Sequence, residues 1–288
     1  MLESAEKASL IEVGGDLSVR EQCEILGLNR SNLYYLPHPR VRIEGELKEQ
    51  VMQRIDYWNT LEPAWGQRKL WQVLQAEEYD VSRDTVRELM GEMGIITIYP
   101  GQNLSKATAN ARKVPYLLRS LRQNGLIWLP NLVWSIDITY IKMGKSHLYL
   151  TAIIDWFSKY LLEWELSDSL ETAAVIDVMN RAFNKFGVPA IANSDQGSQF
   201  TSDEYKQLLL EHGVRQSMDG KGRWADNIAI ERWFRTLKTN NIYIFDYQSP
   251  RELRIGIHDF VGRYNTVRPH ESLQNRTPKV VYESYFRS

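Results

Sequence analysis

The stretch Val133–Ile141, which reads VWSIDITYI, decides the fold. It is rich in β-branched and aromatic residues, and in an extended strand Val133, Asp137 and Ile141 share one face. Burying an acid in the middle of such a strand is costly unless the acid has a partner. Asp137 therefore requires a cation, a solvated cleft or a metal ion. The alternative is a carboxylate satisfied by backbone donors or by an arginine.

The segments on either side of this strand extend an α/β pattern. Strands are predicted at Leu132–Ile141, His147–Asp155, Lys159–Leu166, Ala190–Asn193 and Val214–Met218. Helices are predicted at Leu170–Phe186, from a capping box at Thr201–Glu204 to Gly213, at Ala225–Asn240 and at Pro250–Tyr264. Short turns join the first three strands, which indicates an antiparallel meander. This order of elements is that of the ribonuclease-H-like fold, an α/β fold with a mixed five-stranded sheet.

The chain upstream of residue 100 is predicted to be all-α. A capping box at Ser18–Glu21 opens a helix that ends near Gly27, and a second short helix is expected around Ser31–Tyr35. Further helices are expected at Glu44–Asn59, Gln67–Glu77 and Ser82–Gly94. Helix, tight turn and helix is compatible with a helix-turn-helix, and Arg83 and Arg87 lie on the open side of the last helix. DNA binding is one interpretation of this region, and a generic helical pair is the other.

These patterns divide the chain into four segments. Residues 1–40 are expected to form an N-terminal helix-turn-helix-like segment, and residues 41–100 a helical, helix-turn-helix-like DNA-binding domain. Residues 101–126 are basic and weakly periodic, so they are predicted to be a linker. Residues 127–288 would form a ribonuclease-H-like catalytic core with C-terminal helices.

Composition limits the class of protein and of metal site. Hydrophobic residues make up 43% and charged residues 25% of the chain, as in ordinary globular proteins. No apolar run approaches the roughly 18 residues that a membrane span needs, and no secretory signal is recognisable, so we expect a cytoplasmic protein. Cys23 is the single cysteine, which excludes an internal disulfide and a cysteine-rich zinc site. A metal would be held by carboxylates, which suit Mg²⁺ or Mn²⁺.

Positive charge is concentrated in two parts of the chain, although the formal net charge is −1. Residues 101–145 contain seven lysines and arginines and one acid, and residues 221–288 contain twelve basic and seven acidic residues. Local positive charge of this kind is what phosphate binding needs. A solvated surface face is the alternative interpretation.

Two further acids complete a carboxylate set with Asp137. Asp195 follows the fourth predicted strand, and Gly197 beside it permits a close backbone approach; an Asp in a turn is the alternative. Glu231 lies in mid-helix with Arg235 one turn beyond it, and a surface ion pair between the two is its alternative. Strand, strand end and helix would offer three carboxylates to one cleft, where they could bridge two Mg²⁺ ions. Without cations the three would repel one another.

At these residues the sequence resembles the OrfB-type transposases of bacterial insertion sequences, relatives of retroviral integrases with the DDE catalytic core. The matching segments are Val133–Ile141, Asn193–Ser202, Asp226–Lys238, Tyr264–Asn265, Arg268–His270 and Thr277–Pro278, with Gly66–Arg68 and Val81–Arg83 upstream. In addition, 57 residues (138–194) separate the first two acids and 35 residues (196–230) separate the last two.

The resemblance implies a set of functional residues. Asp137, Asp195 and Glu231 would be the catalytic residues and the ligands of two Mg²⁺ ions, with Mn²⁺ as a substitute. Lys238 would contact DNA near the cleaved end. Further DNA contacts are assigned to Arg235, Asn227, Arg83 and Arg87.

The resemblance also implies a reaction and its partners. The chain would catalyse metal-dependent DNA cleavage and strand transfer without a covalent protein–DNA intermediate. Its partners would be double-stranded DNA, at the element's ends and at the target, and at least one further copy of itself. An upstream-frame helix-turn-helix protein could act as a fusion or a partner, and no membrane is expected. The alternatives are a plain nuclease of the same fold and a non-catalytic DNA-binding regulator.

Some residues depart from the family pattern, and others are predicted to have structural roles only. Asn193 stands where many relatives have His, and Gln67 stands where an aromatic residue is common. Asp155 is expected to serve a turn or a strand edge. Structural roles are also predicted for Asp219 and Asp226, which flank a glycine-containing loop at 219–222, and for Arg268 and His270 in a helix-ending turn.

Overall fold

Strand β1 (Val133–Met143) lies at the centre of a five-stranded sheet with the order β3-β2-β1-β4-β5. β2 (Ser146–Asp155) and β3 (Leu161–Ser167) follow it as an antiparallel meander. β4 (Ile191–Ser194) pairs parallel with β1, and β5 (Arg215–Met218) pairs parallel with β4. The parallel strands are possible because helices supply the crossovers between them. This is the mixed, ribonuclease-H-like sheet that the sequence predicts.

The computed structural model describes residues 7–12, 14, 17–34, 43–98, 118, 121, 125–144, 146–218 and 227–286. The chain forms two compact units, Met1–Ile43 and Glu44–Ser288. The predicted linker at 101–126 lies outside the described residues except for 118, 121, 125 and 126, and the loop at 219–222 and Asp226 also lie outside them. Among the described residues, no helix is both long and apolar enough to cross a membrane.

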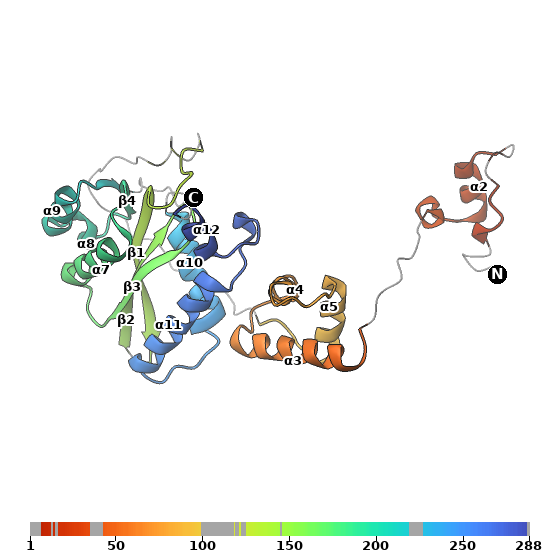
Figure 1. Cartoon of the computed structure of the whole chain (residues 1–288), viewed down its shortest axis with the longest axis horizontal. Helices are drawn as coiled ribbons and strands as arrows, with labels where there is room; N and C mark the ends of the chain where they lie inside the picture. Colours follow the sequence, from red (N-terminus) through yellow and green to blue (C-terminus); the bar gives the residue numbers. More distant parts are fainter. Residues whose placement is uncertain are drawn as a thin grey trace. The chain divides into compact units, whose positions relative to one another are not determined.

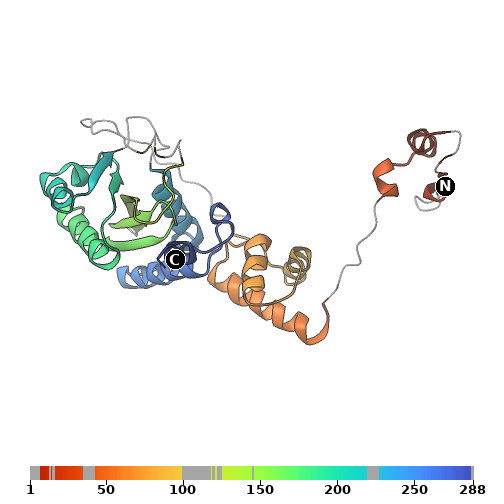
Figure 2. The same cartoon turned by 45° about the horizontal axis from the view of Figure 1, so that its top comes forward.

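Helices cover both faces of the sheet (Figure 1, Figure 2). α7 (Thr172–Phe186) and α9 (Asp203–Glu211) pack on one face, and α10 (Ile228–Leu237) and α11 (Pro250–Thr266) pack on the other. β1 contributes to both cores because its side chains alternate: Trp134 packs with α7, whereas Val133 packs with α10. The shorter elements are α8 (Ser198–Thr201), η2 (Lys238–Ile242), η3 (Glu271–Leu273) and α12 (Pro278–Ser284).

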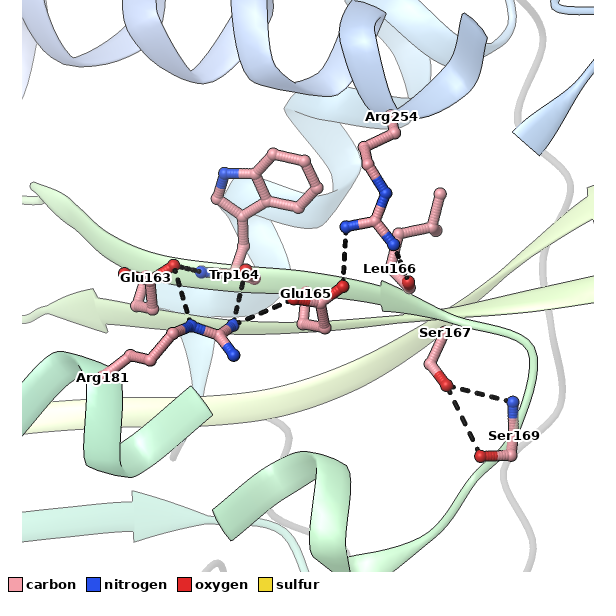
Figure 3. Close-up of polar contacts among 8 residues, drawn as sticks. All are labelled: Glu163, Trp164, Glu165, Leu166, Ser167, Ser169, Arg181 and Arg254. Carbon is pink, nitrogen blue, oxygen red and sulfur yellow. Dashed lines mark hydrogen bonds and ion pairs between the residues drawn. The ribbon is translucent and has the colours of Figure 1, made fainter. Parts of the chain in front are cut away.

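The edge strand β3 is held by arginines from both layers of helices (Figure 3). Arg181 of α7 donates to the Trp164 carbonyl at 3.3 Å and pairs with Glu165 at 3.1 Å. Arg254 of α11 also pairs with Glu165, at 2.6 Å, and donates to the Leu166 carbonyl. These side chains bind outward-facing carbonyls that another strand could otherwise pair with.

Three helices, α3 (Gly45–Leu61), α4 (Gln67–Ala76) and α5 (Arg83–Glu92), form the helical region upstream of the sheet. Their shared core consists of Val51, Ile55, Leu70, Leu74, Val86 and Leu89, and Ser82 caps α5 by accepting from the Thr85 amide. The helical region contacts the sheet region through a buried ion pair. Arg263 of α11 donates to Glu62, which is 1% exposed, at 2.8 Å.

The unit Met1–Ile43 contains α2 (Val19–Leu26) and the 3₁₀ turn η1 (Arg30–Leu33). The predicted capping box is present, since Ser18 and Glu21 each accept the other's backbone N–H. α2 ends at Gly27, whose φ of 63° is the left-handed conformation that glycine adopts without strain. The second short helix is a 3₁₀ turn rather than an α-helix.

The predicted boundaries of α9 and α10 differ from the structure. α9 is capped by Ser202, which accepts from the Tyr205 amide, so the predicted capping box at Thr201–Glu204 is wrong by one residue. The preceding residues form the separate short helix α8. Among its described residues, the helix predicted at Ala225–Asn240 is α-helical over Ile228–Leu237 and continues as the π-helical turn η2.

Candidate active site

The parallel register between β1 and β4 leads Asp137 toward Asp195. It pairs Ser135 of β1 with Asn193 of β4, one residue before β4 ends. Continued by two residues, the same register would place Asp137 opposite Asp195, at the spacing of about 4.8 Å that separates neighbouring strands. Asp137 shares its face of β1 with Val133, which packs in the core beneath α10. Both aspartates therefore lie near the layer that contains α10.

Helix α10 packs on this face of the sheet. One of its side chains contacts β4, and another contacts β1. At its N-cap, Asn227 accepts a hydrogen bond from the Asn193 amide of β4 at 3.4 Å. Just beyond its last turn, Lys238 Nζ donates to Thr139 Oγ1 of β1 at 2.7 Å. At 100° per residue, Glu231 lies within about 40° of both Asn227 and Lys238 around the helix axis. The third predicted acid is thus on the side of α10 that contacts β4 and β1.

The electrostatic surroundings of Glu231 differ from those of a surface ion pair. Among the described residues no ion pair joins Glu231 to Arg235, which is exposed one turn along the helix. Burial raises the pKa of the Glu231 carboxyl. Burial also lowers the pKa of the Lys238 ammonium, and the negative charge of Asp137 opposes that change. Lys238 is therefore within electrostatic range of Asp137. It is also hydrogen bonded to Thr139, which lies two residues further along the same strand.

Each aspartate accepts one backbone hydrogen bond. Asp195 is exposed, and its Oδ1 accepts from the Gly197 amide at 2.9 Å, which is the turn that the sequence offers as an alternative. Asp137 Oδ1 accepts from the Ile138 amide at 2.8 Å. These bonds orient Oδ1 of Asp137 and Oδ1 of Asp195.

Gly197 determines where the Asp195 carboxylate can lie. A Cβ at residue 197 would stand 2.9 Å from Asp195 Oδ1, closer than such atoms normally approach. The φ of Gly197 is −59°, which any residue adopts, so the glycine is needed for space and not for its backbone conformation.

The structure does not bring the three acids into one closed set. Among the described residues, no three acidic, histidine or cysteine side chains are arranged so that they could hold a metal ion. Arg83 and Arg87 are exposed on α5 in the helical region, and Arg87 lies 3.6 Å from Asp84. The site therefore consists of a neighbouring pair of aspartates and a glutamate on the helix that crosses them.

Two other residues of the sheet region bear on the sequence predictions. Asp155 is fully buried and accepts from the amides of Asn131 and Ser158 at 2.9 and 2.8 Å, so the turn role expected for it is confirmed. Thr139, the partner of Lys238, is not singled out by the sequence argument. Its position two residues after Asp137, on the same face of a strand, is the signal that could have identified it.

Comparisons with known proteins agree with this architecture. Residues 129–223 and 212–278 match two integrase core domain families, and residues 46–103 match an HTH-like domain family. The transposase for insertion sequence element IS629 of Shigella sonnei is 28% identical over 250 residues, covering 86% of this chain and 83% of that protein. Transposase InsF for insertion sequence IS3A of Escherichia coli (strain K12) is 26% identical over 272 residues, covering 92% and 93%.

One solved structure similar to this chain is the HTLV-2 integrase catalytic core domain in complex with magnesium, with 21% identity and a TM-score of 0.45. The match covers 54% of this chain and 97% of that domain. The family matches span the helical region and the sheet region, and the relatives align over most of their own length. The chain therefore matches an integrase core domain downstream of an HTH-like domain, and these relatives, at 26–28% identity, are transposases of bacterial insertion sequences.

Proposed function

We propose that this chain cleaves the DNA ends of an insertion sequence and joins them to target DNA, with Asp137, Asp195 and Glu231 as its catalytic metal ligands. One observation carries the proposal. The β1–β4 register leads Asp137 toward Asp195, and Glu231 lies on α10 between the helix's contacts to Asn193 and Thr139, which supports a shared site for the three acids.

The donor set fits two divalent ions. Carboxylate oxygens are the ligands that Mg²⁺ and Mn²⁺ prefer, and Asp137, Asp195 and Glu231 would supply them. Bound ions would activate the attacking oxygen and stabilise the leaving one. Their positive charge would also offset the repulsion that three nearby carboxylates exert on one another.

The neighbouring polar side chains would position the DNA. Lys238 is tied to Thr139 near Asp137, so its ammonium group would hold a phosphate close to the reacting one. Arg235 is exposed next to Glu231 and would contact the backbone further along, while Asn227 would keep the start of α10 against β4.

The reaction would have two steps. Water attacks the phosphorus at the element's end and the bond to the 3′ oxygen breaks, which frees a 3′-hydroxyl group. That hydroxyl then attacks a phosphodiester of the target, and the target's own 3′ oxygen leaves. The reaction conserves phosphodiester bonds in the second step, so it needs no external energy source.

We further infer a division of labour along the chain. The helical region at 41–100, which matches an HTH-like family, would bind DNA through exposed residues such as Arg83 and Arg87, and residues 127–288 would carry the chemistry. The unit before residue 44 would add a helix-turn-helix-like contact. Pairing of two DNA ends requires at least a dimer, and an upstream-frame protein could supply further recognition of the ends.

A cleavage and joining assay on the element's own ends tests the proposal. The wild-type protein is expected to cut and join in Mg²⁺ or Mn²⁺, and Asp195→Asn is expected to abolish both while leaving DNA binding and the fold nearly intact. Asp203→Asn is the matched control, because Asp203 is an exposed acid on α9 whose contact is Lys206 at 3.4 Å.

Three outcomes separate the alternatives. Full activity of Asp195→Asn contradicts the metal assignment. Cleavage without joining of pre-cleaved ends identifies a plain nuclease. DNA binding with neither step, in all metals and with the upstream partner present, identifies a non-catalytic regulator.

A further inference from the structure

A polar cavity of about 610 Å³ lies between the start of α4 and the turn that follows α11. Its lining includes Gly66, Arg68 and Lys69 from the helical region and Arg268 from the sheet region. Asp137, Asp195 and Glu231 do not line it. The cavity is therefore separate from the acid site.

The cavity contains a surplus of positive charge. Arg268 is 7% exposed, and burial together with Arg268 lowers the pKa of Lys69 to about 8. Glu62 is bound to Arg263 of α11 and also interacts electrostatically with Arg268 and Lys69. The largely exposed Glu271 lines the cavity and lies 3.7 Å from Arg68. The lining itself therefore has three cations, Arg68, Lys69 and Arg268, and one acid, Glu271. Like charges held close together in a partly buried space are stabilised by an anion.

The position of Arg268 is fixed by a neutral partner. With the Asn240 amide turned so that its oxygen faces the guanidinium, it accepts two hydrogen bonds from Arg268, at 2.8 and 2.9 Å. A neutral amide orients the guanidinium without cancelling its charge. His270, which also lines the cavity, adds no charge at neutral pH, because burial and the nearby cations lower its pKa to about 3.

The start of α4 adds backbone donors to the same cavity. Gly66 is the N-cap of this ten-residue helix, and no side chain caps its first turn. The nearest atom to a Cβ at residue 66 would be Thr97 Oγ1 at 3.7 Å, so a capping side chain would fit there. The amides of an uncapped first turn and the helix dipole both favour an anion.

We propose that this cavity binds a phosphate of the DNA backbone outside the active site. The phosphate would contact Lys69, Arg68 and the first turn of α4. The positive charge of Arg268, which also lines the cavity, would attract the same phosphate. Because the cations come from both the helical region and the sheet region, one phosphate would join the two to the same DNA. This inference rests on the proposed function, since it takes DNA as the ligand.

A phosphate-neutralisation scan tests the inference. Single phosphates of an element-end duplex are replaced in turn by uncharged methylphosphonates, and binding is measured in EDTA for wild type, Lys69→Gln and Arg68→Gln. Neutralising one particular phosphate should weaken wild-type binding about tenfold, and the same replacement should have little further effect on Lys69→Gln or Arg68→Gln. Each variant should also lower the salt dependence of binding by about one phosphate.

The control is Lys48→Gln, which removes a cation of the same helical region that pairs with Glu92 at 2.6 Å, away from the cavity. It should respond to every neutralised phosphate as wild type does. If Lys69→Gln and Arg68→Gln, folded by circular dichroism, also respond as wild type does at every position, the inference is overturned.

The source of the phosphate has its own measurement. Inorganic phosphate should raise the melting temperature of wild type weakly, and the element-end duplex should raise it more, with both increments reduced in Lys69→Gln. A response to inorganic phosphate alone, with an unchanged scan, contradicts DNA as the ligand. Failure of wild type to bind or cut DNA would instead contradict the proposed function, so the two failures are distinguishable.

Discussion

The acid site and the basic cavity each gather like charges, but they hold them differently. Asp195 lies exposed just past the end of β4, and Glu231 lies on α10, where burial raises the pKa of its carboxyl. Lys69 and Arg268 are partly or wholly buried, and Asn240 accepts hydrogen bonds from Arg268. The acid site would therefore be completed by its ions, whereas the cavity would receive a phosphate among side chains that packing already holds.

Among the variants below, Gly197→Ala should reduce the rate of DNA cleavage most, because it moves the carboxylate of one acid without removing it. In Gly197→Ala the new Cβ would stand 2.9 Å from Asp195 Oδ1, so the carboxylate must move. A displacement of about 1 Å in a catalytic group costs up to about 100-fold in rate, and we expect a loss of that order in DNA cleavage. The backbone conformation suits alanine, so the melting temperature should change little.

Gly262→Ala is the matched control for this variant. Gly262 lies in α11, and nothing lies within 4 Å of a Cβ placed there. Because alanine favours a helix more than glycine does, this variant should be at least as stable as wild type and fully active. Wild-type cleavage by Gly197→Ala would show that the position of Asp195 is not critical, which removes a main support of the acid-site assignment.

The sheet and the position of Asp137 on β1 were predictable because they follow from local periodicity. Alternation along Val133–Ile141 identifies the face of Asp137, and the order of strands and helices identifies the fold. Helical spacing also predicts which side of α10 carries Glu231. It is the side of Asn227 and Lys238, whose side chains contact β4 and β1.

The basic cavity was not predictable because its residues are far apart in the chain. Lys69 and Arg268 are brought together by packing between the helical region and α11, and no local pattern signals such a contact. Arg268 was accordingly assigned to a helix-ending turn. The π-helical turn at Lys238 was missed for a related reason: residues 238–242 have ordinary helical propensity, and packing decides how that helix ends.

Measurements of DNA binding and cleavage should distinguish Lys238, the cation near the acid site, from Lys69, a cation of the cavity. Lys238→Ala removes an ammonium group close to the acid site, so binding to element ends should fall about tenfold and the salt dependence by about one phosphate. Cleavage should fall with it, whereas loss of Lys69 should affect binding more than the chemical step. Both are measured by titration in EDTA and by single-turnover cleavage at saturating protein.

Thr139→Val is the companion variant, because it removes the hydrogen-bond partner of Lys238 and leaves the charge. Its salt dependence should equal that of wild type, with a smaller loss of cleavage. If the salt dependence of Lys238→Ala is unchanged as well, Lys238 is only a helix-surface cation.

The smallest expected change is in the melting temperature of Glu231→Gln measured without metal. Because burial raises the pKa of Glu231, the folded state disfavours its charged form, and the wild-type protein should lose stability as the pH rises through that raised pKa. Glu231→Gln removes this loss, so in EDTA at neutral pH it should melt roughly one to three degrees above wild type. Mg²⁺ should reverse the order, because only wild type retains the full set of ligands. Lower stability of the variant in EDTA would show that burial of the Glu231 carboxylate does not destabilise the fold, and equal stabilisation by Mg²⁺ would show that Glu231 does not bind the metal.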